Sequence, residues 1–580
     1  MTDAARDTSE PGWPAMTLAE VEAALCAPGA KFETEERVIR GVATRIWKNL
    51  PPTLGELARL VAAGYGPREF IVLEDQRITY DAWFRATCAL ARDLAASGVG
   101  KGDRVAVAMR NIPEWIVAVF AVNAIGAIAV PLNAWWTATE FEYGLSDSGS
   151  RMLICDEERL ARVREKLADL PLIDRVIVCR ATGALEGADP IEDIIGAPED
   201  WADLPAGVLP DADVDPDDDA TILYSSGTTG QPKGAILTHR SALTNILSAA
   251  YSSERAMLRR GETPPAETES KVLLLVIPLF HVTGFCAVLL GVMASGSKLV
   301  MMRKWDALEA LKLIEAERVG ITGGVPTIAW QLLEHPDFDK YDLSSLESVS
   351  YGGAPSAPEL VRLIKAKIGA LPGNGWGMTE TSGTVTSHSA EDYMNRPDSA
   401  GPPVAVAELR IMSIDGARDL GVGEVGELWS KGPQMARGYW NKPEASAECF
   451  TEGWVHTGDL ARLDEEGFLF IVDRAKDIII RGGENIFSIE VENVLYDHPA
   501  VTDAALIGLP HRTLGEEPAA VVHLAPGESA SEAELQAWVR ERLAPFKSPV
   551  RIAFCAETLP RNANGKILKR ELRERFFDEA

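Results

Sequence analysis

The chain has 580 residues, of which 46% are hydrophobic, and a formal net charge of −29 at pH 7. This length allows roughly four average domains or fewer large ones, and the hydrophobic fraction suffices for sizeable cores. The negative charge argues against a nucleic-acid partner and against electrostatic docking on anionic lipid, because both need basic patches. Anionic substrates must therefore meet cations that are placed locally in a site.

The seven cysteines are scattered, without the spacing of a metal site, and we expect them to be reduced and mostly buried. Residues 1–50 are expected to form a partly disordered N-terminal extension. Its polar start, without a charged and then apolar leader, favours a cytoplasmic protein. The most apolar stretch, Trp115 to Pro131, is too short for a comfortable membrane span and predicts a buried helix followed by a strand. Peripheral membrane contact stays open if the substrate is lipid-like.

From Tyr80 to about Val178, amphipathic helices alternate with short β-rich runs such as Arg104–Ala108 and Met152–Cys155. This alternation is typical of an α/β fold. The acidic, proline-containing run Leu204–Asp219 then leads as a linker into a predicted strand, Ala220–Leu223.

Directly after that strand, residues 224–235 combine glycines, hydroxyls and Lys233 between two apolar runs. Glycines let backbone N–H groups approach an anion closely, hydroxyls donate hydrogen bonds, and the lysine adds positive charge. By itself the segment fits either a phosphate-binding loop or a polar surface turn. It is not a Walker A sequence, since no Gly-Lys-Ser/Thr closes it, so kinase and P-loop ATPase functions do not follow.

A second α/β unit is predicted downstream, with a strand at Val272–Val276 and a helix at Ala307–Val319. The polar segment Ser252–Ser270 before it is predicted to be a surface loop. After about residue 400, short runs such as Glu427–Ser430 and Phe468–Val472 predict a β-rich subdomain.

The segment Gly421–Gly426 satisfies the pattern G-x-G-x-x-G, but it precedes a strand and not a helix, so we reject dinucleotide binding. Beyond Lys476 the pattern predicts a compact α+β unit. Its expected elements are a strand at Ile478–Ile480, a strand near Ala504–Ile507, and helices at Ser488–Asp497 and Glu532–Leu543.

Seven segments, in order along the chain, resemble the motifs of the adenylate-forming superfamily, and in particular its acyl-CoA synthetase branch. A single short match can arise by chance, but seven matches in the family's order are hard to explain without common descent. The segments are 224–235, Pro278–His281, Tyr351–Pro355, Gly375–Thr381, Gly453–Asp459, Asp473–Asn485 and Leu559–Lys566. The resemblance implies a large N-terminal adenylation domain, residues 51–475, with α/β sheets and a β-rich subdomain. It also implies a small mobile α+β C-terminal domain, residues 476–580, with Lys476 at the hinge.

The resemblance also implies an ATP site. In it the phosphate loop holds the β- and γ-phosphates, Thr379 contacts the α-phosphate, and Glu380 helps to hold Mg²⁺, a hard cation that prefers carboxylate oxygens. Trp376 stands where the family often has tyrosine, and either ring can stack on adenine. The matching ATP-site positions are Ser225, Ser226, Gly227, Thr228, Thr229, Gly230, Lys233, Gly352, Gly353, Ala354, Trp376, Gly377, Asp459 and Arg474.

For catalysis, the resemblance assigns Lys566 to bridging the acid's carboxylate and the α-phosphate, and His281 to positioning the substrate. A lone histidine after an apolar run is more often structural. After adenylation the small domain is implied to rotate, so that Gly482 and Gly483 replace Lys566 and line a channel for the pantetheine of CoA.

The segments that match the family's acyl pocket, His281–Phe285 and Val325–Trp330, are largely apolar. The resemblance implies an AMP-forming acyl-CoA synthetase that uses ATP, Mg²⁺ and CoA. The apolar segments favour a hydrophobic acid as its substrate, foremost a medium- or long-chain fatty acid. An aryl or cinnamic-type acid, a carrier protein as acceptor, and a non-catalytic nucleotide- or acyl-binding protein are the alternatives. A homodimer stays open.

Overall fold

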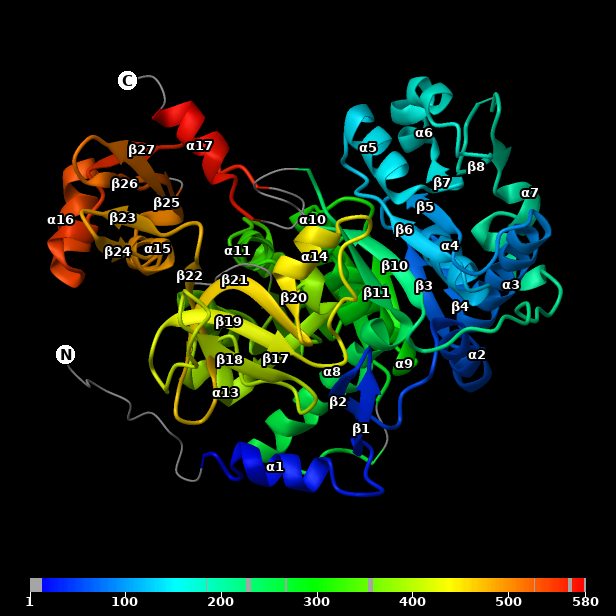
Figure 1. Ribbon diagram of the computed structural model, residues 1–580, viewed down its shortest axis with the longest axis horizontal. Coiled ribbons are helices and arrows are strands. Elements are labelled where there is room, and N and C mark those ends of the chain that lie inside the picture. Colours follow the sequence, from blue (N-terminus) through cyan, green and yellow to red (C-terminus); the bar gives the residue numbers. More distant parts are fainter. Residues whose placement is uncertain are drawn as a thin grey trace.

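The computed structural model describes residues 13–577 except 184, 226–230, 267–268, 353–357, 526 and 562–565. In these residues there are four main sheets and a hairpin of β1 (Thr34–Ile39) and β2 (Val42–Trp47). The elements that follow the hinge candidate Lys476 lie to one side of the rest (Figure 1). The fold is a mixed α/β architecture with a large N-terminal part and a small C-terminal part, as predicted.

A seven-stranded sheet has the order β11-β10-β6-β5-β7-β8-β9, parallel except for the antiparallel edge pair β10–β11. Helix α4 (Pro113–Ala124) is buried along its whole length, which confirms the predicted buried helix. The strands of this sheet are β5 (Arg104–Ala108), β6 (Ile128–Pro131), β7 (Met152–Asp156), β8 (Arg175–Cys179), β9 (Asp189–Pro190), β10 (Asp219–Tyr224) and β11 (Gly234–Thr238).

An eight-stranded sheet has the order β17-β16-β15-β14-β12-β13-β3-β4, with a parallel centre and an antiparallel pair at each edge. Parallel strands covered on both faces read as near-continuous apolar runs, as β12 does. The strands are β3 (Glu69–Leu73), β4 (Gln76–Thr79), β12 (Val272–Leu275), β13 (Lys298–Met301), β14 (Ile321–Gly324), β15 (Ser348–Gly352), β16 (Leu371–Met378) and β17 (Gly383–Ser389).

The predicted β-rich subdomain is an antiparallel sheet, and the strands beyond Lys476 form a separate mixed sheet. The β-rich sheet contains β18 (Glu408–Met412), β19 (Gly426–Lys431), β20 (Phe450–Thr451), β21 (Trp454–Leu463) and β22 (Leu469–Arg474). The small C-terminal sheet contains β23 (Ile479–Arg481), β24 (Glu484–Ile486), β25 (Val501–His511), β26 (Gly515–Leu524) and β27 (Arg551–Phe554).

Seventeen α-helices occur in the described part of the chain. Besides α4 they are α1 (Leu18–Leu25), α2 (Leu54–Tyr65), α3 (Tyr80–Ala96), α5 (Ala138–Ser148), α6 (Glu157–Val163), α7 (Glu192–Ile195), α8 (His239–Arg259), α9 (Leu290–Ala294), α10 (Ala307–Glu317), α11 (Pro326–Leu333), α12 (Pro358–Leu363), α13 (Ala390–Asn395), α14 (Pro443–Cys449), α15 (Ser488–Tyr496), α16 (Glu532–Arg542) and α17 (Lys569–Phe576). Within the described ranges, none of these helices is long and apolar enough to cross a membrane.

One predicted loop is wrong in its first half. Helix α8 runs on to Arg259, so the first eight residues of the polar segment Ser252–Ser270 are helical. The reason is an internal ion pair, in which Arg259 Nε lies 2.8 Å from a carboxylate oxygen of Asp392, and both side chains are buried. Polar composition indicates exposure only when the polar groups lack partners inside the protein.

All seven cysteines are free thiols, and five of them are buried, which confirms the prediction of reduced, mostly buried cysteines.

Candidate functional site

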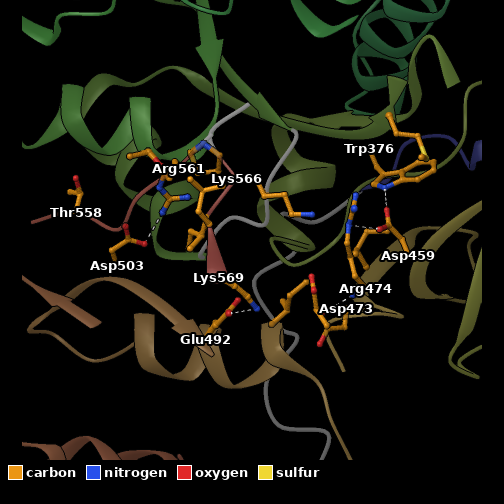
Figure 2. Close-up of a pocket in the computed structure, with 18 of the residues that line it drawn as sticks. Trp376, Asp459, Asp473, Arg474, Glu492, Asp503, Thr558, Arg561, Lys566 and Lys569 are labelled. Atoms are coloured by element: carbon orange, nitrogen blue, oxygen red, sulfur yellow. Dashed lines mark hydrogen bonds and ion pairs between the residues drawn. The ribbon is translucent and has the colours of Figure 1, made fainter. Parts of the chain in front are cut away.

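A cleft of about 1170 Å³ lies between the large and the small part of the molecule, and both contribute to its walls (Figure 2). From the large part come the end of β16, His281, Asp459 and Arg474. From the small part comes Lys566, so residues far apart in the sequence share one cavity.

One corner of the cleft is built around the carboxylate of Asp459, which is 4% exposed. The indole Nε1 of Trp376 donates a hydrogen bond of 2.8 Å to one oxygen, and Arg474 Nε lies 2.9 Å from the other (Figure 2). Strands β21 and β22 pair Asp459 directly with Arg474, which fixes the ion pair through the backbone. The sequence motifs indicated all three residues, but the bond between indole and carboxylate carries no sequence signal. A carboxylate accepts several hydrogen bonds, so Asp459 retains acceptor capacity for a ligand hydroxyl.

The segment with the predicted phosphate loop joins the antiparallel strands β10 and β11. Its ends are fixed, since Ser225 N donates to Lys233 O at 2.9 Å and the Tyr143 hydroxyl donates to Pro232 O at 2.9 Å. Ser225 and Pro232 line the cleft. The predicted phosphate contacts Ser226–Gly230 lie outside the described residues, as do Gly353 and Ala354.

Thr379 and Glu380 form a single helical turn directly after β16, whose last residue, Met378, lines the cleft. Glu380 is 6% exposed, and the Tyr439 hydroxyl donates to its Oε1 at 2.7 Å. No cluster of three metal-ligating side chains occurs in the part of the chain that the structure describes. A lone carboxylate nevertheless fits Mg²⁺ that arrives with ATP, because this ion takes most of its ligands from phosphates and water.

Two described glycines of the predicted ATP site, Gly352 and Gly377, lie on the neighbouring strands β15 and β16. Gly352 ends β15 and pairs with Gly375 of β16. A Cβ on Gly377 would come within 1.8 Å of the Gly383 carbonyl oxygen, so the packing of β16 against β17 alone requires glycine there.

Lys566 lies in the cleft with the Asp459 corner, and burial together with the neighbouring Arg474 lowers the pKa of Lys566 to about 8. The hinge candidate Lys476 also lines the cleft, and burial lowers the pKa of its ammonium group. Gly482 and Gly483 form the turn between β23 and β24 with positive φ angles, and they are not among the residues that line the cleft. In this arrangement the lysine, and not the glycine turn, faces the site.

His281 lines the same cleft as Trp330 and Pro326, two residues of the predicted acyl pocket. Burial lowers the pKa of His281 to about 3, so the imidazole is neutral near pH 7. A neutral ring can donate or accept a hydrogen bond but cannot supply a positive charge.

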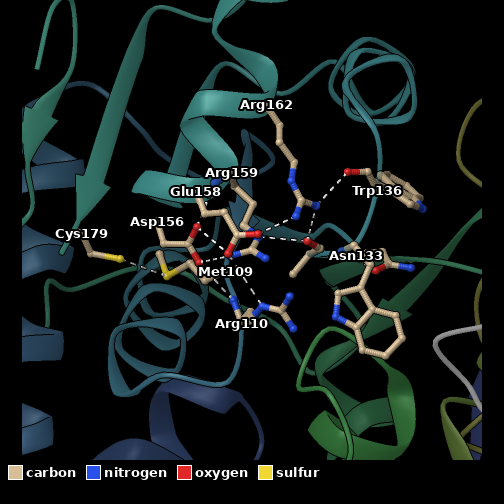
Figure 3. Close-up of polar contacts among 11 residues, drawn as sticks. Met109, Arg110, Asn133, Trp136, Asp156, Glu158, Arg159, Arg162 and Cys179 are labelled. Carbon is tan, nitrogen blue, oxygen red and sulfur yellow. Dashed lines mark hydrogen bonds and ion pairs between the residues drawn. The ribbon is translucent and has the colours of Figure 1, made fainter. Parts of the chain in front are cut away.

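The wall formed by Asn133, Trp135 and Trp136 was not predicted from the sequence. Two arginines fix its backbone (Figure 3): Arg159 donates to Ala134 O at 2.9 Å, and Arg162 donates to Trp136 O at 3.2 Å. Arg159 is itself buried and paired with Asp156, the N-cap of α6. The only sequence signal is an aspartate three residues before an arginine, which is too common to identify a site.

One interaction connects the large and small parts at the cleft. Asp473, at the end of β22, accepts a hydrogen bond from the backbone N–H of Ser488, the first residue of α15. Burial raises the pKa of Asp473 to about 6. The carboxylate is therefore one of the groups through which the large part contacts the small part.

Comparison with known proteins gives two family matches in the same order as the two parts of the structure. The family model described as "AMP-binding enzyme" matches residues 59–440, and the one described as "AMP-binding enzyme C-terminal domain" matches residues 490–566.

Among curated relatives, the feruloyl-CoA synthase of an Amycolatopsis species is 36% identical over 86% of this chain and 94% of its own length. The long-chain-fatty-acid–CoA ligase of Bacillus subtilis is 33% identical over 90% of this chain and 94% of its own length. The solved o-succinylbenzoate–CoA synthetase of B. subtilis, in complex with ATP and a magnesium ion, superposes with a TM-score of 0.74. It is 31% identical and the match covers 89% of this chain and 99% of that one. The chain belongs to the AMP-binding enzyme family, within its adenylate-forming acid–CoA ligases.

Proposed function

We propose that this protein is an ATP-dependent, AMP-forming ligase that joins a hydrophobic carboxylic acid to CoA. The observation that carries the proposal is that Lys566 and the Asp459–Arg474–Trp376 corner share one cleft. The Asp459 corner of the large domain can accept hydrogen bonds from the hydroxyls of a nucleotide. The Lys566 ammonium group of the small domain can hold a second anion beside that nucleotide.

The reaction needs two steps, because a carboxylate oxygen is a poor leaving group. First, the carboxylate attacks the α-phosphorus of ATP, the bond to the β-phosphate oxygen breaks, and pyrophosphate leaves with the bonding electrons. The thiol of CoA then attacks the acyl carbon of the mixed anhydride, loses its proton, and AMP leaves. In the first step Lys566 reduces the repulsion between carboxylate and α-phosphate.

The remaining groups hold the nucleotide and substrate. Asp459 accepts hydrogen bonds from the ribose hydroxyls, and the loop around Ser225 and Lys233 holds the phosphates. Thr379 contacts the α-phosphate, and Glu380 binds the Mg²⁺ that accompanies ATP. The neutral His281 positions the acid through a hydrogen bond, and no base is needed, because the carboxylate is already ionised near pH 7.

We propose a medium- or long-chain fatty acid as the acid, supported by the apolar residues Pro326 and Trp330 of the cleft and by the long-chain relative. A cinnamic-type aryl acid is the second candidate, since a feruloyl-CoA synthase is among the relatives. We place the enzyme in the cytoplasm.

The experiment that tests the proposal is AMP release from Mg·ATP with aliphatic acids of graded length, benzoate and ferulate, each with and without CoA. We expect AMP release that depends on CoA and on one class of acid. Pyrophosphate release without a thioester would point to a carrier protein as acceptor. ATP binding without pyrophosphate release on any acid would contradict a ligase and favour a binding protein.

The pKa of Lys566 predicts an alkaline limit for adenylation. If the ammonium form bridges the two anions, kcat/KM for ATP in pyrophosphate exchange should fall as pH rises through about 8, because the free enzyme loses this proton there. A Lys566→Arg variant stays protonated to a much higher pH. We expect the variant to be slower, but its kcat/KM should not fall as pH rises through about 8. If the variant shows the same fall as the wild type, a group other than Lys566 causes it.

A further inference from the structure

A short segment between strands β19 and β20 of the β-rich sheet joins two parts of the proposed ATP site. Residues 437–440 lie alongside β11, the strand that follows the phosphate loop. Arg437 N donates to Ile236 O at 2.8 Å, Ile236 N donates to Gly438 O at 2.9 Å, and Trp440 N donates to Gly234 O at 2.8 Å. The residue before this segment, Ala436, donates its N–H to the carbonyl of Glu380 at 2.8 Å. The backbone thus connects the end of the phosphate loop to the Thr379–Glu380 turn.

The side chain of Tyr439 also connects these two parts, through its hydroxyl group and through its ring. Its hydroxyl donates to Glu380 Oε1 at 2.7 Å, and the ammonium group of Lys233 lies 5.0 Å from the centre of its ring. The ring packs edge-on against Phe450 at 5.6 Å, and only 8% of the residue is exposed. One buried residue therefore contacts the proposed magnesium carboxylate and the lysine of the phosphate loop.

The direction of this hydrogen bond is well defined, because an ionised carboxylate can only accept and the phenol must therefore donate. A phenol with its ordinary pKa of about 10 is protonated near pH 7, so the Tyr439 hydroxyl has a proton to donate to the Glu380 carboxylate. The hydroxyl also lies 3.6 Å from the thiol of Cys449, whose pKa burial raises to about 12. The donor occupies one acceptor position of Glu380 and leaves the others for a cation.

We propose that Tyr439 is a positioning residue that orients the Glu380 carboxylate for Mg·ATP and fixes its position relative to Lys233. The inference rests on the proposed function, in which Glu380 binds the magnesium of ATP. A hydrogen-bond donor that fixes a metal-binding carboxylate commonly changes metal affinity by about 10–100-fold when it is removed. The cation–π contact of Lys233 uses the ring alone and does not depend on the hydroxyl.

The test is Tyr439→Phe, which keeps the ring contacts with Lys233 and Phe450 and deletes only the donor to Glu380. ATP affinity is measured by calorimetry in excess Mg²⁺ and again in EDTA. We expect the variant to bind Mg·ATP about tenfold more weakly and to bind metal-free ATP as the wild type does. The control is Tyr80→Phe, which removes a buried hydroxyl that donates to Ser297 O at 2.7 Å outside the site. It should leave both affinities unchanged.

A second variant keeps the inference testable if Tyr439→Phe folds poorly. Glu380→Gln should show the same magnesium-specific loss, and the double variant should lose little more than either single one, because both act through one carboxylate. Equal weakening with and without Mg²⁺, no weakening, or additive losses would overturn the proposal. If the wild type bound Mg·ATP tightly but formed no acyl-adenylate, the proposed ligase function would be contradicted. The ATP affinities with and without Mg²⁺ would still decide the role of Tyr439.

Discussion

Lys566→Ala should slow acyl-adenylate formation about 10²–10³-fold, since losing one preorganised contact to a charged transition state commonly costs a few kcal/mol. The structure places this lysine in the cleft with Asp459 and Arg474, and its lowered pKa reflects burial there. Thioester formation from supplied acyl-adenylate should be nearly unaffected, because the bond to the α-phosphate is already made. Pyrophosphate exchange measures the first step, and CoA-dependent consumption of acyl-adenylate measures the second.

The matched control is Lys547→Ala. Lys547 is another lysine of the small part, paired with Glu490, and it does not line the cleft. It should leave both steps close to wild type. If Lys566→Ala lowered both steps equally, the lysine would have a structural role and not the proposed catalytic one.

Gly483→Leu should abolish thioester formation and largely preserve adenylation. A Cβ on Gly483 meets nothing within 4 Å in this structure, so a side chain can begin there without a clash while Lys566 faces the cleft. The proposed second step brings the turn of Gly482 and Gly483 to the cleft, where a leucine would obstruct the thiol. The measurements are pyrophosphate exchange and thioester yield from supplied acyl-adenylate.

Backbone strain has to be separated from obstruction, because Gly483 has a φ of +92°, which L-residues rarely adopt. Gly483→Ala introduces the same strain with a much smaller side chain. We expect the alanine variant to retain most of the thioester activity that the leucine variant loses. Equal losses in both variants would indicate a damaged turn, and loss of adenylation as well would rule out a channel role.

Sequence patterns predicted helices and strands correctly where the pattern depends only on neighbouring residues. The run before Ser225 predicts β10 and the apolar stretch from Trp115 predicts α4, because each element is determined by neighbouring residues. The last eight residues of α8 were mispredicted as a loop, since Asp392, the partner of Arg259, lies more than a hundred residues away.

The same limit applies to the site. The motifs identify Glu380 and Asp459, but their contacts with Tyr439 and Trp376 arise only when distant strands are brought together. The burial that lowers the pKa of Lys566 likewise depends on how the small part meets the large one. A sequence motif can thus indicate which residues are chemically important, but their environment comes from the tertiary structure.

The segment 437–440 has a consequence for how the chain folds. Strand β11 lies at the end of the seven-stranded sheet, and an unpaired edge strand is a template for aggregation. Its outer edge is covered by residues that the ribosome makes later, so β11 lacks this cover while the residues between Thr238 and Arg437 are being synthesised. A chain that stops before Arg437 would carry this open edge permanently. Residues 437–440 therefore protect the folded large part from aggregation through β11.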